Sequence, residues 1–271
     1  MPELPEVETT LKGILPKANK QTIKQIIIRN NSLRWPVDNC LTKILPGLKL
    51  LKISRRAKYL LLKTEKGHII IHLGMSGVLK ILPHAAEVKK HDHIDLIFEN
   101  GFLLRYNDPR RFGCFLWTEE PINKHKLLKH LAPEPLTNQF SSDYLFAIVQ
   151  KRKIAIKTLL MENKSVVGVG NIYANEALFS SSIAPTRLAN SLTLTETKRL
   201  CANIKTILTR AIEQGGTTLK DFLSPDGKSG YFVQELAVYD KEGKSCPTCN
   251  TPIIKIIQTQ RASFYCPSCQ Q

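Results

Sequence analysis

The chain has 271 residues, of which 42% are hydrophobic, enough for a sizeable core in two domains or one large one. Lysine and arginine number 39 against 23 acidic residues, and the resulting formal net charge of +16 is typical of proteins that bind polyanions, nucleic acid first among them. The longest apolar runs are too short to span a bilayer, and the acidic start differs from a signal peptide, so we expect a cytoplasmic protein without membrane association.

The chain starts with Met1-Pro2-Glu3-Leu4-Pro5-Glu6, and apolar residues then follow at the spacing of an amphipathic helix. Proline and acidic residues are common in the first turn of a helix, so this segment alone favours a structural role. After removal of Met1, however, Pro2 would present a secondary amine, which forms an iminium ion with an aldehyde. Pro2 is therefore also a candidate nucleophile.

Residues 22–118 show short apolar runs separated by turn residues, which predicts a β-sandwich or barrel on which the N-terminal helix packs. Period-2 alternation places Lys58 on the same strand face as Arg56, either as a solvated edge or as a phosphate-binding stripe. The predicted strands are Thr22–Arg29, Leu48–Ser54, Lys58–Lys63, His68–Leu73, His93–Phe98, Phe102–Tyr106 and Phe112–Trp117.

Two turns in this region carry residues that suit insertion into a DNA duplex. The segment 108–113, Asp-Pro-Arg-Arg-Phe-Gly, combines arginine with an aromatic wedge, and Met75 lies between glycines in the segment 73–77. Charged turns are more often simply solvated and methionines more often buried in the core, so each pattern alone is weak. His91 and His93 have no further ligand cluster nearby, which favours hydrogen bonding or a DNA contact over a metal site.

After the proline-punctuated segment 131–135 the pattern becomes helical, with predicted helices at Tyr144–Gln150, Ala155–Met161, Ile172–Phe179 and Thr195–Gln214. Thr193 and Glu196 have the spacing of a capping box for the last helix, which the pair Gly215-Gly216 ends. The glycine-rich segment 166–173 leads into a helix and suits either phosphate binding or a tight interhelical turn. Residues 217–236 are predicted to form a short helix followed by a mobile loop.

Four of the seven cysteines form two C-x-x-C pairs, Cys246 with Cys249 and Cys266 with Cys269, separated by sixteen residues. This spacing predicts a tetrahedral four-thiolate site for one structural Zn²⁺, and a redox dithiol is disfavoured because no thioredoxin-like context flanks the pairs. A hairpin, Ile253–Gln258 and Arg261–Tyr265, is predicted between them. Arg261 lies at its turn, either as a solvated charge or as a phosphate clamp on a metal-pinned hairpin.

Taken together, these segments resemble the formamidopyrimidine-DNA glycosylase family along essentially the whole chain. The resemblance implies an α+β protein with an N-terminal helix on a catalytic β-sandwich (1–132), a helix-two-turn-helix DNA-binding domain with a lid over the lesion (133–236), and a four-cysteine zinc-finger hairpin (237–271). It is carried by Met1–Glu8, Arg55–Leu62, Ile70–Gly77, Lys90–His93, Tyr106–Gly113, Val166–Glu176, Gln214–Phe222 and Cys246–Cys269.

The resemblance also implies roles for single residues. Pro2 attacks the sugar C1′ to form a Schiff base, Glu3 assists ring opening and base loss, and Lys58 donates the proton in β-elimination. Arg261 acts in δ-elimination and phosphate binding. The remaining assignments are gap filling by Met75, Arg110 and Phe112, DNA binding by His91, Arg110, Arg152 and Asn171, and lid formation by residues 217–231.

We therefore expect a monomeric DNA glycosylase and abasic-site lyase that removes oxidised purines such as 8-oxoguanine and formamidopyrimidines from double-stranded DNA. An endonuclease VIII-like glycosylase for oxidised pyrimidines shares the Pro2-Glu3 start and the finger, but the segments 4–8 and 110–112 and the extended lid favour the purine enzyme. A non-catalytic zinc-ribbon DNA-binding protein would also explain the charge and the finger, but it leaves Pro2 without a role.

Overall fold

The computed structural model describes residues 2–217 and 232–271, so all of the predicted lid except Thr217 lies outside the described residues. The chain divides into two compact units. The first runs to Lys129 and includes Gln214–Thr217, and the second comprises His130–Glu213 and Phe232–Gln271. The finer division into three domains, with boundaries at 132 and 236, remains a prediction.

The first helix, α1, spans Leu4–Ala18 and confirms the helix predicted at the start of the chain. Glu3 is its N-cap residue and forms a capping box with Glu6, whose Oε2 accepts the Glu3 N–H at 2.8 Å. Capping satisfies N–H groups that have no partner inside a helix, which explains why the helix begins here. Pro2 thus immediately precedes the N-cap of α1 and lies outside the helix.

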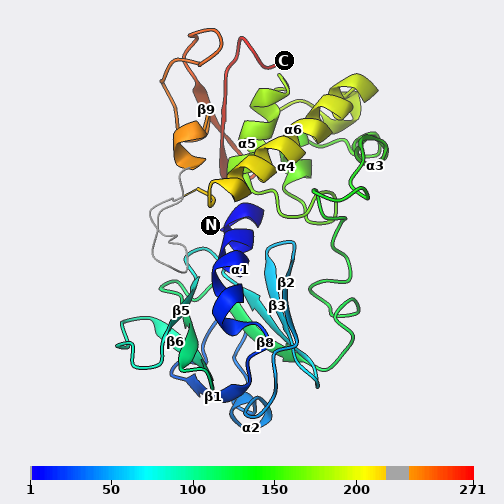
Figure 1. The fold of residues 1–271 in the computed structure, drawn as a ribbon. Coiled ribbons are helices and arrows are strands. Elements are labelled where there is room, and N and C mark those ends of the chain that lie inside the picture. The colour runs from blue at the N-terminus through cyan, green and yellow to red at the C-terminus, as the bar shows by residue number, and fades with distance from the viewer. Residues whose placement is uncertain (1, 218–231) are drawn as a thin grey trace. The chain divides into compact units, whose positions relative to one another are not determined.

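The first unit also contains two four-stranded antiparallel sheets (Figure 1). The order of the first is β1 (Ile23–Ile28), β6 (Asp92–Phe98), β7 (Phe102–Asn107) and β5 (Val78–Pro83), and that of the second is β2 (Lys52–Arg56), β3 (Tyr59–Lys63), β4 (His68–His72) and β8 (Cys114–Thr118). A short helix, α2, spans Leu41–Ile44. One apolar core joins side chains of both sheets, such as Ile94 and Leu60, to Val7 and Ile14 of α1. The predicted helix-covered sandwich is confirmed.

The position of Lys58 differs from the prediction. Arg56 pairs with Tyr59, so Ala57 and Lys58 form a two-residue turn between β2 and β3, and the expectation that Lys58 shares a strand face with Arg56 is wrong. Such tight turns need residues with positive φ, which glycine and asparagine usually supply. Here Ala57 takes a φ of 51°, so the turn carries no composition signal that would have separated it from a strand.

The second unit contains the predicted helices and hairpin. They are α3 (Ser142–Val149), α4 (Ile156–Leu160), α5 (Asn171–Ser180), α6 (Leu194–Glu213), the 3-10 turns η1 (Ala189–Ser191) and η2 (Phe232–Glu235), and the strands β9 (Ile254–Gln258) and β10 (Arg261–Tyr265). The capping box of α6 is present, because the Glu196 N–H donates to Thr193 Oγ1 at 3.2 Å and Glu196 Oε2 accepts the Thr193 N–H at 2.8 Å. Among the helices of the described chain, none is both long and apolar enough to cross a bilayer.

Candidate functional site

Buried carboxylates organise the start of the chain. Pro2 is buried and Glu3 is 2% exposed. The two oxygens of Glu6 hold two different segments, since Oε2 accepts from the Glu3 N–H while Oε1 accepts from the Thr217 N–H and Oγ1–H at 2.8 and 2.9 Å. Glu6 therefore ties the backbone next to Pro2 to Thr217, the first residue of the predicted lid and the part of it that the structure describes.

The turn that carries Lys58 is linked to the same helix. Arg55 Nε donates to Glu8 Oε2 of α1 at 2.6 Å, and Arg55 Nη1 donates to the carbonyl oxygen of Ala57 at 2.9 Å. Lys58 itself is 9% exposed. Burial and then the charge of Lys58 lower the pKa of His72 to about 4, so this imidazole is neutral near pH 7. Lys58 therefore lies near a neutral histidine, on a turn held by Arg55.

Two loops of the first unit carry the predicted duplex-inserting residues. Met75 is half-buried, whereas Phe112 is 46% exposed and the guanidinium carbon of Arg110 lies 4.9 Å from its ring centroid. His91 is half-buried with a left-handed φ of 71°. The arginine over the ring presents a cation and an apolar face together, which suits a group that enters a base stack.

In the second unit the glycine turn leads directly into α5. Gly168 has a φ of 81°, Gly170 is the N-cap residue in extended conformation, and Asn171 is the first residue of the helix. Asn171 Nδ2 donates to the carbonyl oxygen of Ala262 at 3.0 Å, next to Arg261 at the start of β10. The turn is therefore joined to the tip of the predicted finger. Arg152, on a different segment, forms an ion pair with Glu162 at 2.8 Å.

Several buried polar residues that hold the finger were not identified from the sequence. Lys157, 2% exposed, donates through Nζ to the Ala262 carbonyl and to Ser263 Oγ, both at 2.7 Å. The carboxylate of Glu176 accepts the backbone N–H groups of residues 237, 238 and 239 at 2.8 to 3.0 Å, and burial raises its pKa. The single lysine within the apolar run of α4 was the one available signal. These contacts hold β10 and the chain leading to the finger against α4 and α5, so that the exposed Arg261 projects from a braced hairpin.

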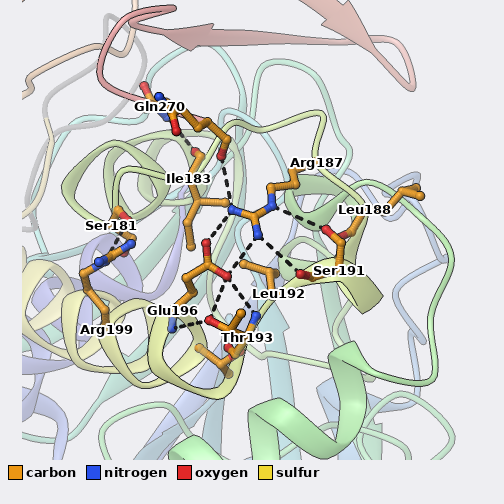
Figure 2. Close-up of polar contacts among 12 residues, drawn as sticks. Ser181, Ile183, Arg187, Leu188, Ser191, Leu192, Thr193, Glu196, Arg199 and Gln270 are labelled. Carbon is orange, nitrogen blue, oxygen red and sulfur yellow. Dashed lines mark hydrogen bonds and ion pairs between the residues drawn. The ribbon is translucent and has the colours of Figure 1, made fainter.

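A polar cluster holds the end of the finger to the segment between α5 and α6 (Figure 2). Gln270, 3% exposed, accepts the Cys266 N–H through Oε1 at 2.9 Å and donates through Nε2 to the Ile183 carbonyl at 2.8 Å. Beside it, Arg187 donates to both carboxylate oxygens of Glu196. One buried amide thus connects the loop of Cys266, a predicted metal ligand, to the helical part of the unit.

The four paired cysteines meet as predicted. Their Sγ atoms all lie within 4.8 Å of one another, with Cys246 and Cys269 at 3.9 Å and Cys249 and Cys266 at 3.4 Å. Tetrahedral Zn²⁺ with Zn–S bonds of about 2.3 Å requires sulfur atoms roughly 3.8 Å apart, so the donor set fits this ion. Four thiolates leave no coordination position for substrate, which indicates a structural role.

Comparisons with known proteins cover the whole chain. The sequence models of the formamidopyrimidine-DNA glycosylase N-terminal domain and H2TH domain match residues 1–115 and 131–223. Proteins of that name from Hydrogenovibrio crunogenus and Escherichia coli are 64% and 55% identical over all of this chain and over 97% and 100% of their own lengths.

Solved structures of the same family share the fold of this chain. The Thermus thermophilus MutM (Fpg) protein superposes with a TM-score of 0.90 at 36% identity, covering 99% of this chain and 98% of its own. The Lactococcus lactis Fpg in complex with DNA containing N7-benzyl-Fapy-dG superposes with a TM-score of 0.92 at 33% identity and covers 100% of both chains. The same protein has been solved with DNA that contains an abasic site.

Proposed function

The chain belongs to the formamidopyrimidine-DNA glycosylase family, and on that premise we propose that it excises oxidised purines from double-stranded DNA and then cleaves the strand at the resulting abasic site. The observation that supports this most directly is the start of the chain. Pro2 and Glu3 stand at the capped end of α1, where Glu6 holds the neighbouring backbone in place. The Lactococcus lactis relative, solved with lesion-containing DNA, supports the substrate class.

In the proposed reaction the Pro2 nitrogen, freed by removal of Met1, attacks C1′ of the damaged nucleotide. The bond from C1′ to the base breaks, and the base leaves with that electron pair and takes up a proton. Glu3 assists opening of the sugar ring, which leaves an iminium between Pro2 and C1′.

The iminium then draws electrons from C2′, so that the C2′ proton becomes acidic. Its loss expels the 3′ phosphate in β-elimination, with Lys58 supplying the proton to the leaving group. A second elimination expels the 5′ phosphate, for which Arg261 binds the phosphate oxygens. The main-chain amine of Pro2 and the side chains of Glu3, Lys58 and Arg261 are the groups assigned to these steps.

We further propose that Zn²⁺ occupies the four-cysteine site and braces the hairpin that bears Arg261. His91, Arg152 and Asn171 are proposed to contact the DNA backbone, with Arg110 shared between backbone binding and gap filling. For Arg152, DNA binding would compete with its ion pair to Glu162.

Borohydride trapping tests the proposal. Incubation with a duplex that contains 8-oxoguanine should give a covalent protein–DNA complex, and mapping should place the link on Pro2. A Pro2→Gly form that cleaves as fast as the wild type would overturn the assignment of the nucleophile. Excision of thymine glycol in parallel decides between purine and pyrimidine substrates, and this comparison is needed because the Lactococcus lactis Fpg has also been solved with DNA that contains an oxidised pyrimidine.

A further inference from the structure

Asp108 is a fully buried carboxylate that accepts hydrogen bonds from two hydroxyl groups and one backbone N–H. It is 0% exposed and lies between β7 and the exposed Arg110. Its Oδ1 accepts the Ser76 hydroxyl at 2.8 Å, while Oδ2 accepts the Gly113 N–H at 2.9 Å and the Tyr106 hydroxyl at 3.2 Å. Taking an acidic group out of water is unfavourable unless hydrogen bonds replace its hydration, so this cluster of donors points to a constraint that a smaller neutral residue would not meet.

The hydrogen bonds of Asp108 join two loops that are distant in the sequence. The methionine loop, residues 74–77, carries Met75, and the arginine loop, residues 108–113, carries Arg110 and Phe112. Ser76 belongs to the first loop and donates to Asp108 of the second, while its Oγ also accepts the Arg110 N–H at 3.2 Å. The Ser76 hydroxyl thus contacts both the Asp108 carboxylate and the backbone of Arg110, whose guanidinium lies over the Phe112 ring.

The backbones of the two loops are also in direct contact. A Cβ placed on Gly74, whose φ is 64°, would lie 2.4 Å from the Gly113 nitrogen and 2.5 Å from the Phe112 carbonyl carbon. A Cβ on Gly113 would lie only 1.8 Å from the Tyr106 hydroxyl oxygen. That hydroxyl lies 3.2 Å from both the His72 carbonyl oxygen and Asp108 Oδ2. The two loop backbones therefore approach more closely than any residue with a Cβ would allow at Gly74. Separating the loops would break this close contact.

We propose that Asp108 is a positioning residue that joins the methionine and arginine loops into one rigid wedge, so that Met75 and Phe112 enter the duplex as a unit. This inference rests on the proposed function, since it takes Met75, Arg110 and Phe112 as the residues that fill the gap. Two independent loops would each lose conformational freedom on entering DNA, whereas joined loops have already lost it on folding. The wedge can then offset unstacking of the damaged base in one step.

The substitution Asp108→Asn tests the link with almost no change of shape. Asparagine keeps one carbonyl oxygen for Ser76 but turns an NH₂ group toward the Gly113 N–H, so that two donors face each other and this link between the loops is lost. The Tyr106 hydroxyl can still accept from the NH₂ group and donate to the His72 carbonyl oxygen. Single-turnover excision of 8-oxoguanine from a duplex should fall on the order of tenfold. Nicking of single-stranded DNA with a preformed abasic site should stay unchanged, because no stacked partner strand has to be displaced.

A matched control and a second variant separate positioning from loss of folding. Asp38→Asn removes the same charge from an exposed loop of the first unit, where Asp38 Oδ1 accepts the Cys40 N–H, and should excise at the wild-type rate. Ser76→Ala deletes only the bridging hydroxyl and should lower duplex excision in the same direction as Asp108→Asn. Thermal unfolding of each variant shows whether it is folded at the assay temperature, so that a slower rate can be assigned to the position of the loops.

A double-mutant cycle of Met75→Ala and Phe112→Ala gives the deciding result. In the wild-type background the double variant should lose little more than the worse single variant, and in the Asp108→Asn background the two losses should multiply. Additive losses in the wild-type background, or wild-type excision by Asp108→Asn, would overturn the proposal.

The same double-mutant cycle can be measured as binding affinity for a duplex that contains a tetrahydrofuran abasic analogue, where no base is excised. A wild-type protein that shows this coupling in binding but excises no purine would refute the proposed function while supporting the joined wedge.

Discussion

Replacing Glu196 by glutamine should destabilise the second unit in a manner that depends on pH. Hydrogen bonds from Arg187 first, and then those from Thr193, lower the pKa of Glu196 from 4.5 to about 2 (Figure 2). Because the pKa is lower in the folded chain than in the unfolded chain, the charged form stabilises the fold. This contribution is complete above about pH 4.5 and is lost as the pH falls toward about 2.

The structure sets the size of the effect. A shift from 4.5 to about 2 is about 2.5 units, and at about 1.36 kcal/mol per unit the upper limit is ~3.4 kcal/mol. The side chains of Arg187 and Glu196 are 26% and 19% exposed, so solvent screens part of this attraction. We therefore expect a loss of about 1–2 kcal/mol at neutral pH. Glutamine retains the oxygen that accepts from Thr193, so the capping box is kept and the loss reports the charge.

Urea unfolding of the wild type and Glu196→Gln from pH 7 to about pH 3 measures the difference, which should shrink to roughly half at the acid end. Taking the difference cancels protonation of the cysteine thiolates, which both proteins share. Glu242→Gln is the control, because the Lys255–Glu242 pair at 3.2 Å is 40% and 58% exposed and should contribute almost nothing. Equal stability of Glu196→Gln and wild type at pH 7, or a difference that grows on acidification, would refute the reasoning.

Three further outcomes are expected. Gly216 and Gly101 both have a φ of 82°, but an added Cβ meets Glu6 Oε1 at 2.9 Å only at Gly216. Gly216→Ala should therefore lose more unfolding free energy than Gly101→Ala and should trap lesion DNA more slowly, whereas equal losses would show that backbone strain alone matters. Chelation of the bound metal should abolish strand cleavage until Zn²⁺ is restored, and full cleavage after measured metal release would contradict a bracing role. Gln270→Ala removes the hydrogen bonds to the Cys266 N–H and to the helical segment, about 1–3 kcal/mol, and should speed metal loss to a chelator in a colorimetric assay; an unchanged release rate would argue against the bridge.

Local signals in the sequence were sufficient for most elements. The Thr193–Glu196 box and the glycines after residue 213 delimit α6 within a residue or two, because capping and helix termination act over one turn. The hairpin of β9 and β10 followed from the cysteine spacing. β5 was not predicted, since it is an edge strand that ends at Pro83 and lacks a regular alternation of buried and exposed residues.

Only those site residues whose type and spacing form a recognisable motif could be predicted from the sequence itself. The four cysteines follow from spacing, whereas the roles of Pro2, Glu3, Lys58 and Arg261 came from the family resemblance and await experiment. The apolar run around Lys157 hinted that this lysine is buried, but the sequence did not show what Lys157 or Asp108 joins, because Ala262 and Ser76 lie 105 and 32 residues away from them along the chain. Whether such a polar residue is buried depends on the tertiary fold. Hydrophobic periodicity and composition predict local elements but not which polar side chains the fold encloses.

Buried polar residues perform the same task in both units. Glu6 and Asp108 hold loops of the first unit, and Lys157 and Glu176 hold the finger in the second. The net charge of +16 attracts any phosphate backbone, and backbone contacts alone carry no information about a damaged base. On the proposed function, discrimination needs contacts made when a base is extruded, and we expect a firmly held wedge to be one source of them. Weakening the Asp108 brace should consequently reduce the preference for damaged over intact DNA while leaving the salt dependence of binding unchanged, because the substitution removes no phosphate-binding side chain.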